Sequence, residues 1–219
     1  MSTLSSRSTR WTIAIVAVVA VLIAALLASL GDHLVPGATL PSPADREHRD
    51  ADTPEALAPL RQRAGLRSCP VGTTDPDNLG SDAMSGIVVE CMADGSAIDV
   101  ARALAGRTVL LNLWAYWCAP CAAELPAMAE YQQRVGSDVM VVTVHQDENE
   151  AAGLRRLAEL GVHLPTLQDG RRRIAAALRV PNVMPATVLL AADGSVARML
   201  PRAFASADEI AAAVGDQVK

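Results

Sequence analysis

The sequence predicts an α/β domain with a mixed central sheet flanked by helices, preceded by an N-terminal transmembrane helix. Three observations lead to this prediction: an uncharged apolar run near the N-terminus, strand-length apolar runs that alternate with helix-length segments beyond Gly106, and an Asp-Gly hairpin followed by a last helix. Alternating strands and helices build a parallel sheet with helices on both faces, and a terminal hairpin adds antiparallel strands to it.

The apolar run occupies residues 11–30 and carries no charge. At about 1.5 Å per residue it reaches roughly 30 Å, the thickness of a bilayer core. Arg7 and Arg10 precede the run, and the first charge after it is Asp32. The positive-inside rule therefore keeps residues 1–10 in the cytoplasm and exports the rest. A cleaved signal peptide is the alternative, although its apolar region usually has only about 7–15 residues. We expect a retained signal anchor, which makes this a single-pass protein of the cell membrane.

Residues 31–65 are predicted to form a flexible, proline-rich tether, and residues 66–219 the extracytoplasmic domain. The tether segment is polar, contains several prolines and lacks apolar periodicity. A short helix is expected only within "ALAPLRQRAGL", at 56–66, and residues 69–82 are predicted to be a loop because they are rich in Gly, Pro, Asp and Asn.

Within the domain, the elements follow from apolar runs and turn signals. In order, we expect a strand at 86–92, a turn and short helix at 93–104, a strand at 108–115, a helix at 121–135, a strand at 138–145, a helix at 149–161, an extended segment at 163–170, a short helix at 172–178, a hairpin at 185–200 and a helix at 207–217. The run at 108–115 is continuously apolar, which is typical of a strand covered on both faces. The hairpin turns at Asp193-Gly194, and Ser206 with Glu209 forms a capping box for the last helix.

Composition excludes one class of function. The chain is 51% hydrophobic and only 3% aromatic, with a net charge of −5. Its basic residues form short clusters, such as Arg171 to Arg173, without interleaved aromatic residues. A nucleic-acid partner is therefore not expected.

Cys118 and Cys121 form a CxxC pair, for which three chemistries are available. A zinc site needs four ligands, but the sequence has no second CxxC or closely spaced histidine pair. A purely structural disulfide across so short a loop removes little entropy from the unfolded chain. A redox pair fits best, because the helix begins inside the motif and its N-terminus stabilises a Cys118 thiolate. Pro120 suits the first turn of that helix. Cys118 then attacks a substrate disulfide and Cys121 resolves the mixed disulfide. We expect neither a metal nor a cofactor.

The motif resembles that of a known family. "WCAPC" after a buried strand, followed by "AAELP", is similar to the thioredoxin superfamily and, more narrowly, to the membrane-anchored TlpA/ResA-like thiol-disulfide oxidoreductases, whose hallmark is WCxPCxxExP. All fixed positions of the hallmark are filled, by Trp117, Cys118, Pro120, Cys121, Glu124 and Pro126. The resemblance covers residues 86–217 and implies a thioredoxin-like fold with a redoxin/AhpC-TSA-like domain.

The resemblance also implies substrate-binding residues. Thioredoxin-like folds carry a cis-proline that faces the CxxC, and both Pro181 and Pro185 are candidates. A strand starts directly after Pro185, which favours that residue. The backbone of Met184 would then pair with an extended substrate segment, as one strand pairs with another. Trp117 would belong to the apolar face on which the substrate docks, whereas Trp114 is expected in the core.

Two positions depart from the family pattern. Asn112 occupies the place of the buried Asp that transfers protons in thioredoxin. The resemblance implies that Glu124 takes this role instead. A buried Glu124 would have a raised pKa and act as general acid and base for the Cys121 thiol. The alternative is a solvated Glu that favours the helix N-terminus by its charge. His145 stands where the family has Asn or Asp, and we expect it at the surface or behind the site rather than in catalysis.

Cys69 and Cys91 lie at the entry to the region of resemblance. In an exported domain we expect them to form a structural disulfide that ties the N-terminal loop to the first strand. The alternative is a second redox pair that relays electrons.

The sequence thus predicts a membrane-tethered, extracytoplasmic oxidoreductase that exchanges disulfides in exported proteins through a Cys-Ala-Pro-Cys pair. The resemblance favours reduction, as in cytochrome c-type biogenesis, with electrons from a membrane thiol donor of the DsbD/CcdA kind. Two alternatives stay open: a disulfide-forming oxidase of the same fold, and a copper- or haem-handling module that uses the cysteines as ligands. The residues between the cysteines do not fix the direction.

Overall fold

The computed structural model describes residues 16–17, 19–20, 52–72 and 81–215. Most of the predicted membrane anchor at 11–30 lies outside these residues, as do the first part of the predicted tether and residues 73–80. Within the described ranges, no helix combines the length and the apolar character that a bilayer crossing requires.

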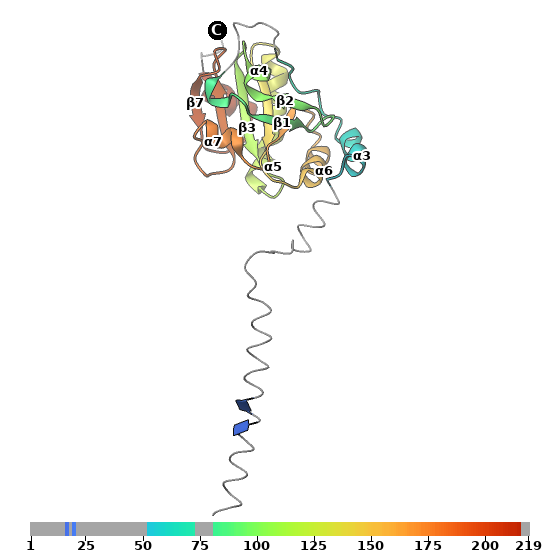
Figure 1. Ribbon diagram of the computed structural model, residues 1–219. Helices are drawn as coiled ribbons and strands as arrows, with labels where there is room; N and C mark the ends of the chain where they lie inside the picture. Colours follow the sequence, from blue (N-terminus) through green and yellow to red (C-terminus); the bar gives the residue numbers. More distant parts are fainter. Residues whose placement is uncertain (1–15, 18, 21–51, 73–80, 216–219) are drawn as a thin grey trace, which may run out of the picture. The chain divides into compact units, whose positions relative to one another are not determined.

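Apart from strand β2, the order of strands and helices beyond residue 86 agrees with the sequence prediction. The elements are α3 (Pro54–Ala64), the 3₁₀ helix η1 (Asp82–Met84), β1 (Val88–Cys91), β2 (Ala97–Asp99), α4 (Val100–Leu104), β3 (Val109–Trp114), α5 (Ala119–Val135), β4 (Met140–His145), α6 (Glu150–Leu160), β5 (Thr166–Gln168), α7 (Arg173–Ala177), β6 (Ala186–Leu190), β7 (Val196–Leu200) and α8 (Ala207–Val214). Figure 1 shows their arrangement.

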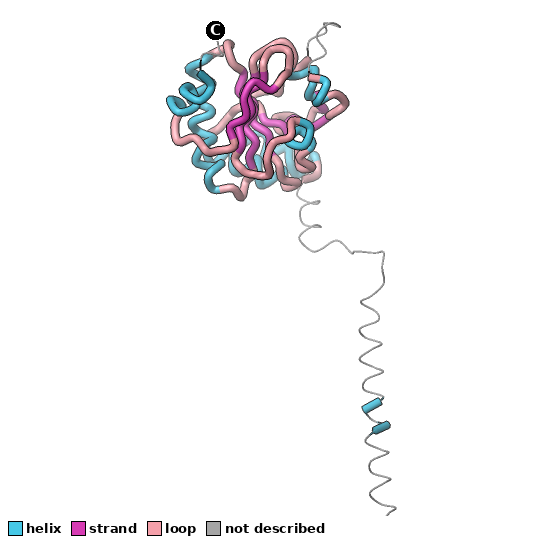
Figure 2. The backbone as a smooth tube through the Cα atoms, turned by 90° about the vertical axis from the view of Figure 1, so that its left-hand side faces the viewer, coloured by secondary structure: helices cyan, strands magenta, loops and turns pink. Residues whose placement is uncertain are grey.

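The strands form one mixed sheet in the order β2-β1-β5-β4-β3-β6-β7. β3, β4 and β5 are parallel, and the remaining neighbours are antiparallel. The predicted mixed sheet flanked by helices is therefore confirmed (Figure 2). β2 lies where only a turn and a helix were predicted. A strand of three residues is too short to show an alternating pattern, and its pairing with β1 sets its conformation.

Each face of the sheet carries its own buried cluster. Residues of α3, α5, α6 and α8 pack on one face, and residues of η1, α4 and α7 pack on the other. All six residues of β3 are buried, as its continuous apolar run predicts. Successive side chains of a strand point to opposite faces, and Leu110 and Trp114 belong to the cluster that contains α5. Asn112, between them, therefore faces α5.

Helix α5 begins two residues earlier than predicted, at Ala119 rather than Cys121. Cys118 is its N-cap residue, and the Cys121 backbone N–H donates to the Cys118 Sγ at 3.3 Å. Pro120 occupies the first turn, where no intrahelical bond is lost. The early start places the nucleophile candidate at the helix terminus itself.

The predicted tether boundary at residue 65 is wrong for its last part, because α3 packs on the domain. Leu57 and Ala64 are 2% and 0% exposed and join the cluster that includes α6. The Arg61 guanidinium lies 3.0 Å from the Glu150 carboxylate of α6 and also pairs with Glu90 of β1. Thus the ordered domain starts before residue 66, and α3 belongs to it (Figure 1).

Candidate active site

The two cysteines of the CxxC motif lie shortly after the end of β3, at the start of α5. β3 ends at Trp114, and the Cys118 N–H donates to the Ala115 carbonyl at 3.0 Å as the chain turns into the helix. Cys118 and Cys121 are joined as a disulfide, with exposed fractions of 5% and 0%. Cys118 is the more accessible residue of the two, which fits the predicted order of attack by Cys118 and resolution by Cys121.

Trp117 projects from the surface directly before the pair. It is 59% exposed, and its Nε1–H donates to Asp147 Oδ2 at 2.8 Å. Asp147 Oδ1 in turn accepts from the Asn149 backbone N–H at 2.9 Å. The loop after β4 therefore holds the indole in place. Sequence reasoning did not single out Asp147, because a carboxylate before a helix is equally typical of a capping residue.

The cis peptide bond lies between Met184 and Pro185, the pair that the sequence favoured over Pro181. β6 starts at the next residue, and its Ala186 is the register partner of Leu113 in β3. This pairing brings the cis-proline beside the end of the strand that leads to the cysteines. The substrate-binding role of Met184 stays a prediction.

Glu124 is buried rather than solvated, with an exposed fraction of 0%. The Asn112 amide Nδ2 donates to Glu124 Oε2 at 3.2 Å and to Thr187 Oγ1 at 3.3 Å. Burial raises the pKa of Glu124 to about 7, although the bond from Asn112 favours the carboxylate. Among the described residues, Oε1 has no hydrogen-bond partner. Glu124 follows Cys121 by three positions on α5, so the two share a helix face.

Comparison with known proteins agrees with this geometry. The redoxin family model matches residues 72–209. The chain belongs to the redoxin family. ResA of Bacillus subtilis, named a thiol-disulfide oxidoreductase, is 31% identical over 122 residues, which cover 55% of this chain and 66% of ResA. ResA of Bacillus thuringiensis is 28% identical over 56% of this chain and 69% of its own length. The matched segment thus spans about two thirds of each relative.

Two solved structures share the redoxin's fold. A secreted Mycobacterium tuberculosis disulfide oxidoreductase, described as homologous to E. coli DsbE, superposes with a TM-score of 0.53 at 24% identity, covering 61% of this chain and 98% of the other. A secreted thiol-disulfide isomerase from Corynebacterium glutamicum gives 0.52 at 22% identity, covering 67% and 96%. These similarities establish the thioredoxin-like fold.

In this redoxin His145 is fully buried. Of the two positions expected for it, the one at the surface is wrong, and the one behind the site agrees with the structure. Its ring centroid lies 4.8 Å from that of Trp114, and its Nδ1 lies 2.8 Å from Gln168 Oε1. Gln168 Nε2 donates to the Asp147 carbonyl at 2.6 Å, which orients the amide and assigns the proton to His145 Nδ1. Burial lowers the pKa of His145, so the ring is neutral. His145 thereby supports the loop that holds Trp117.

A sequence signal for this burial exists in α6. A Cβ on Gly153 would lie 3.0–3.1 Å from ring atoms of His145. Glycine in a helix interior costs about 1 kcal/mol relative to alanine, so its presence there marks a close approach by another group.

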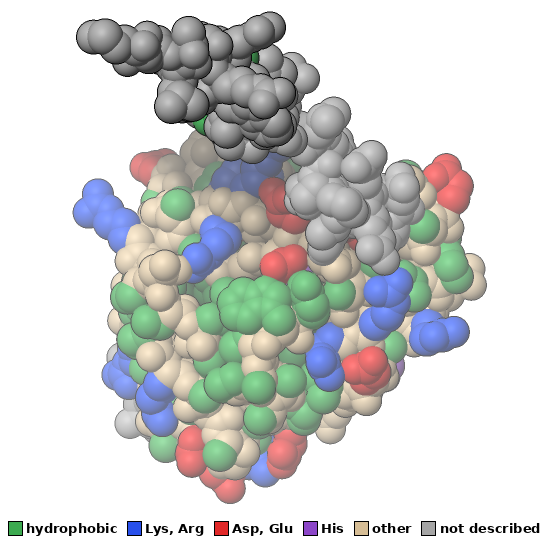
Figure 3. Space-filling model, turned by 90° about the horizontal axis from the view of Figure 1, so that it is seen from below, with side chains coloured by type: hydrophobic (Ala, Val, Ile, Leu, Met, Phe, Trp, Pro, Cys, Tyr) green, Lys and Arg blue, Asp and Glu red, His purple; other side chains and the backbone are tan. Residues whose placement is uncertain are grey.

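An apolar face surrounds the cysteine end of the redoxin. The start of α5 lies at the lower end of the domain in Figure 1, and Figure 3 shows that end with hydrophobic side chains gathered at its centre and charged side chains around them. Besides Trp117, Val183 of the loop before the cis-proline is 46% exposed. Such a face suits an extended apolar segment of another chain.

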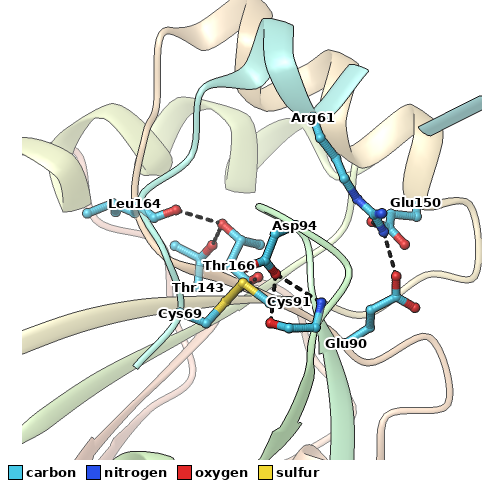
Figure 4. Close-up of a disulfide and its surroundings, with 10 residues drawn as sticks. Arg61, Cys69, Glu90, Cys91, Asp94, Thr143, Glu150, Leu164 and Thr166 are labelled. Atoms are coloured by element: carbon cyan, nitrogen blue, oxygen red, sulfur yellow. Dashed lines mark hydrogen bonds and ion pairs between the residues drawn. A yellow bond between two sulfur atoms is a disulfide. The ribbon is translucent and has the colours of Figure 1, made fainter. Parts of the chain in front are cut away.

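Cys69 and Cys91 form a second disulfide, which joins the loop after α3 to β1 (Figure 4). Both are buried, with exposed fractions of 7% and 0%, in the cluster that contains α4 and α7. The CxxC disulfide belongs to the cluster on the opposite face of the sheet. Thiol-disulfide exchange requires sulfur atoms in contact, so the folded domain offers no direct relay between the two pairs.

Proposed function

We propose that this redoxin is a thiol-disulfide oxidoreductase that exchanges disulfides in other proteins through Cys118 and Cys121. The observation that carries the proposal is the position of the pair at the start of α5, with a buried Glu124 one turn further whose pKa is about 7. The similarity to ResA, which bears this activity in its name, supports it.

In the reducing direction the reaction begins with both cysteines as thiols. The Cys118 thiolate, stabilised by the helix N-terminus, attacks one sulfur of the substrate disulfide. A mixed disulfide forms, and the other substrate sulfur leaves as a thiolate that takes up a proton. The Cys121 thiolate then attacks Cys118 Sγ, which closes the Cys118–Cys121 disulfide and releases the second substrate thiol. The substrate gains two electrons and the redoxin loses two.

Glu124 supplies the proton transfer that the second step needs. A thiol at the buried Cys121 must lose its proton before it attacks, and water has little access to it. The Glu124 carboxylate, whose Oε1 carries no other hydrogen bond among the described residues, accepts that proton. A pKa of about 7 leaves this group partly ionised at neutral pH, so it also returns the proton when the reaction runs in reverse.

The central experiment uses the two single serine variants. Cys118→Ser should abolish reduction of a protein disulfide, and Cys121→Ser should accumulate a covalent mixed disulfide that reductant releases. The matched control is Cys69→Ala/Cys91→Ala, which should retain exchange. Full activity in both single serine variants would contradict the proposal, and stoichiometric copper binding without exchange would indicate a metal-handling module instead.

We further propose that the redoxin works outside the cytoplasm as a reductant of protein disulfides, including those between the haem-binding cysteines of apocytochrome c, with electrons from a membrane donor of the DsbD/CcdA kind. The apolar run at 11–30 and the resemblance of the motif to the TlpA/ResA-like group support this placement. Equilibration with glutathione tests the direction, since a reductant should have a potential near the thioredoxin end of the range, about −270 mV, rather than about −120 mV.

The membrane anchor has its own test. The full-length chain should sediment with membranes, resist carbonate extraction and be digested by a protease added outside spheroplasts. A shorter, soluble product would indicate a cleaved signal peptide, and protection from the protease would contradict the extracytoplasmic placement.

A further inference from the structure

Two arginines that flank α7 share an unusual backbone conformation. Arg172 has φ +56° and Arg179 has φ +55°, and they are the non-glycine residues with positive φ in the described part of the chain. The left-handed region is unfavourable for long side chains, and it persists where surrounding interactions hold it. The interactions of the two side chains differ.

The Arg172 guanidinium bonds to two loops, whereas Arg179 makes no side-chain hydrogen bond within the described residues. Arg172 Nε donates to Gln146 Oε1 at 3.2 Å, and its Nη1 donates to Asn182 Oδ1 at 2.6 Å. A guanidinium carries several donors in a fixed plane, so it can hold two acceptors at a set separation.

Each acceptor belongs to one side of the cysteine site. Gln146 is 5% exposed, and its backbone N–H donates to the Trp114 carbonyl at 2.8 Å, which fixes it to the end of β3. Asn182 belongs to the loop 181–184, which leads to the cis bond before Pro185. Arg172 therefore spans from the strand ends to the cis-proline loop.

The loop 181–184 has few other attachments. Across the described residues, the bond from Arg172 is the one hydrogen bond that joins this loop to a side chain elsewhere in the fold. A hollow of about 290 Å³, lined in part by Arg172, Ala176 and Asn182, separates the loop from α7. Packing on α7 therefore does not replace the guanidinium as the support of Asn182, although Met184 at the end of the loop packs on the cluster that contains α5.

We propose that Arg172 is a positioning residue that holds the loop 181–184 so that the Met184 backbone can pair with an extended peptide bearing the disulfide. The inference rests on the proposed function and deepens it: the preferred substrates are disulfides within extended polypeptide segments. A small aromatic disulfide has no backbone to pair with the loop and should depend on it less. Pre-organised loops bind with less loss of conformational freedom, so freeing the loop should weaken peptide binding.

The test compares Arg172→Gly with the matched control Arg179→Gly. Both variants relieve a positive φ and remove a guanidinium, but only the first removes the bonds to Gln146 and Asn182. The reduced full chain is mixed with excess synthetic peptide containing one internal disulfide, or with 5,5′-dithiobis(2-nitrobenzoic acid), and its single oxidation is followed. KM is then the substrate concentration at half the limiting rate, and kcat is that limiting rate. We expect the KM for the peptide to rise about tenfold in Arg172→Gly, with kcat and the rate on the small disulfide changing much less, and Arg179→Gly to resemble the wild type.

A second variant keeps the inference testable if Arg172→Gly folds poorly. Asn182→Ala removes the acceptor from an exposed position and should raise the peptide KM in the same way, and the double variant should add little to it because one interaction is removed twice. Equal losses in Arg172→Gly and Arg179→Gly, equal losses on both substrates, or no rise in the peptide KM would overturn the inference. A wild-type protein inert toward both disulfides would instead overturn the proposed function.

Discussion

At the scale of single residues, the proposed proton transfer to the cysteines depends on the pair Asn112 and Glu124. Asn112 cannot exchange a proton, but its amide holds Glu124 Oε2 from the strand side and leaves Oε1 unbonded within the described residues. The acid therefore lies on the helix, on the same face as Cys121. Two predictions follow from its raised pKa.

Glu124→Gln should slow resolution of the mixed disulfide at least tenfold at pH 7, because glutamine cannot accept the Cys121 proton. In the wild type this step should accelerate as pH rises through about 7, where the carboxylate forms, and the variant should lose that acceleration. Stopped-flow release of the substrate thiol measures the step. Glu130→Gln, on the exposed surface of the same helix, is the control.

The same substitution should stabilise the fold at high pH. The pKa of Glu124 is about 7 in the folded state, against 4.5 for an unperturbed glutamate, so between these pH values the folded state binds more protons than the unfolded state. Stability is then lost as pH rises through that window and stays low above it. The shift corresponds to about 3 kcal/mol at most, which Glu124→Gln should recover at pH 8 but not at pH 4. Urea unfolding at both pH values checks it, and a gain of equal size at both would contradict the burial argument.

At the scale of elements, α3 is held to the domain by an apolar contact surface and by the ion pairs of Arg61 with two carboxylates. Leu57 and Ala64 face the domain, and the Arg61 side chain points toward Glu90 and Glu150 (Figure 4). The side chains of Arg61 and Glu150 are only 11% and 4% exposed. Removing one partner of a buried ion pair lowers the free energy of unfolding, because the other charge then stays buried without a counter-ion.

Arg61→Ala should therefore lower the free energy of unfolding by about 3 kcal/mol, because it leaves the Glu150 carboxylate buried without its cation. Arg61→Met/Glu150→Gln should lose clearly less, since both charges leave together. Arg63→Ala, an exposed arginine of the same helix, should change stability little. Urea unfolding of the three variants gives the comparison, and a double variant weaker than Arg61→Ala would count against a buried ion pair.

At the scale of the whole molecule, the sheet separates the two disulfides, which lie on its opposite faces. The CxxC pair lies on the α5 face at the apolar end of the domain, and Cys69–Cys91 lies on the α4 face. The second disulfide closes a separation of 22 residues between the loop after α3 and β1. A crosslink of this size contributes about 3 kcal/mol in the chain-entropy model.

Reduction of the Cys69–Cys91 disulfide should accordingly destabilise the fold, also in a variant that lacks the CxxC cysteines. In a Cys118→Ser/Cys121→Ser background, strong reductant should lower Tm by several degrees, and Cys69→Ala/Cys91→Ala should show the lower Tm without reductant. Thermal unfolding followed by circular dichroism measures this. An unchanged Tm in both cases would show that the disulfide adds no stability.

Local patterns in the sequence determined much of this protein. The apolar run of β3, the Asp-Gly turn of the hairpin and the Ser206 cap of α8 each depend on neighbouring residues, so the fold class and most element positions could be predicted. The CxxC pair is visible in the sequence itself, whereas the choice of Pro185 came from the resemblance of the motif to the thioredoxin superfamily. The resemblance predicted that Glu124 is buried. In the structure, Asn112 of β3 points toward α5 and donates a hydrogen bond to the buried Glu124.

Only the tertiary structure decided the contacts between distant segments. Trp117 and Asp147 are 30 positions apart, and Arg61 and Glu150 are 89 apart. Neither local sequence identifies its distant partner. As a result, α3 was predicted to be part of a tether, β2 was missed, and the sequence left open whether His145 lies at the surface or behind the site. The two bonds of Arg172 belong to the same class. The local sequence determines which residues can form a helix, a strand or a thiolate. Whether two distant side chains come into contact depends instead on the order of the strands in the sheet, because that order sets which segments become neighbours.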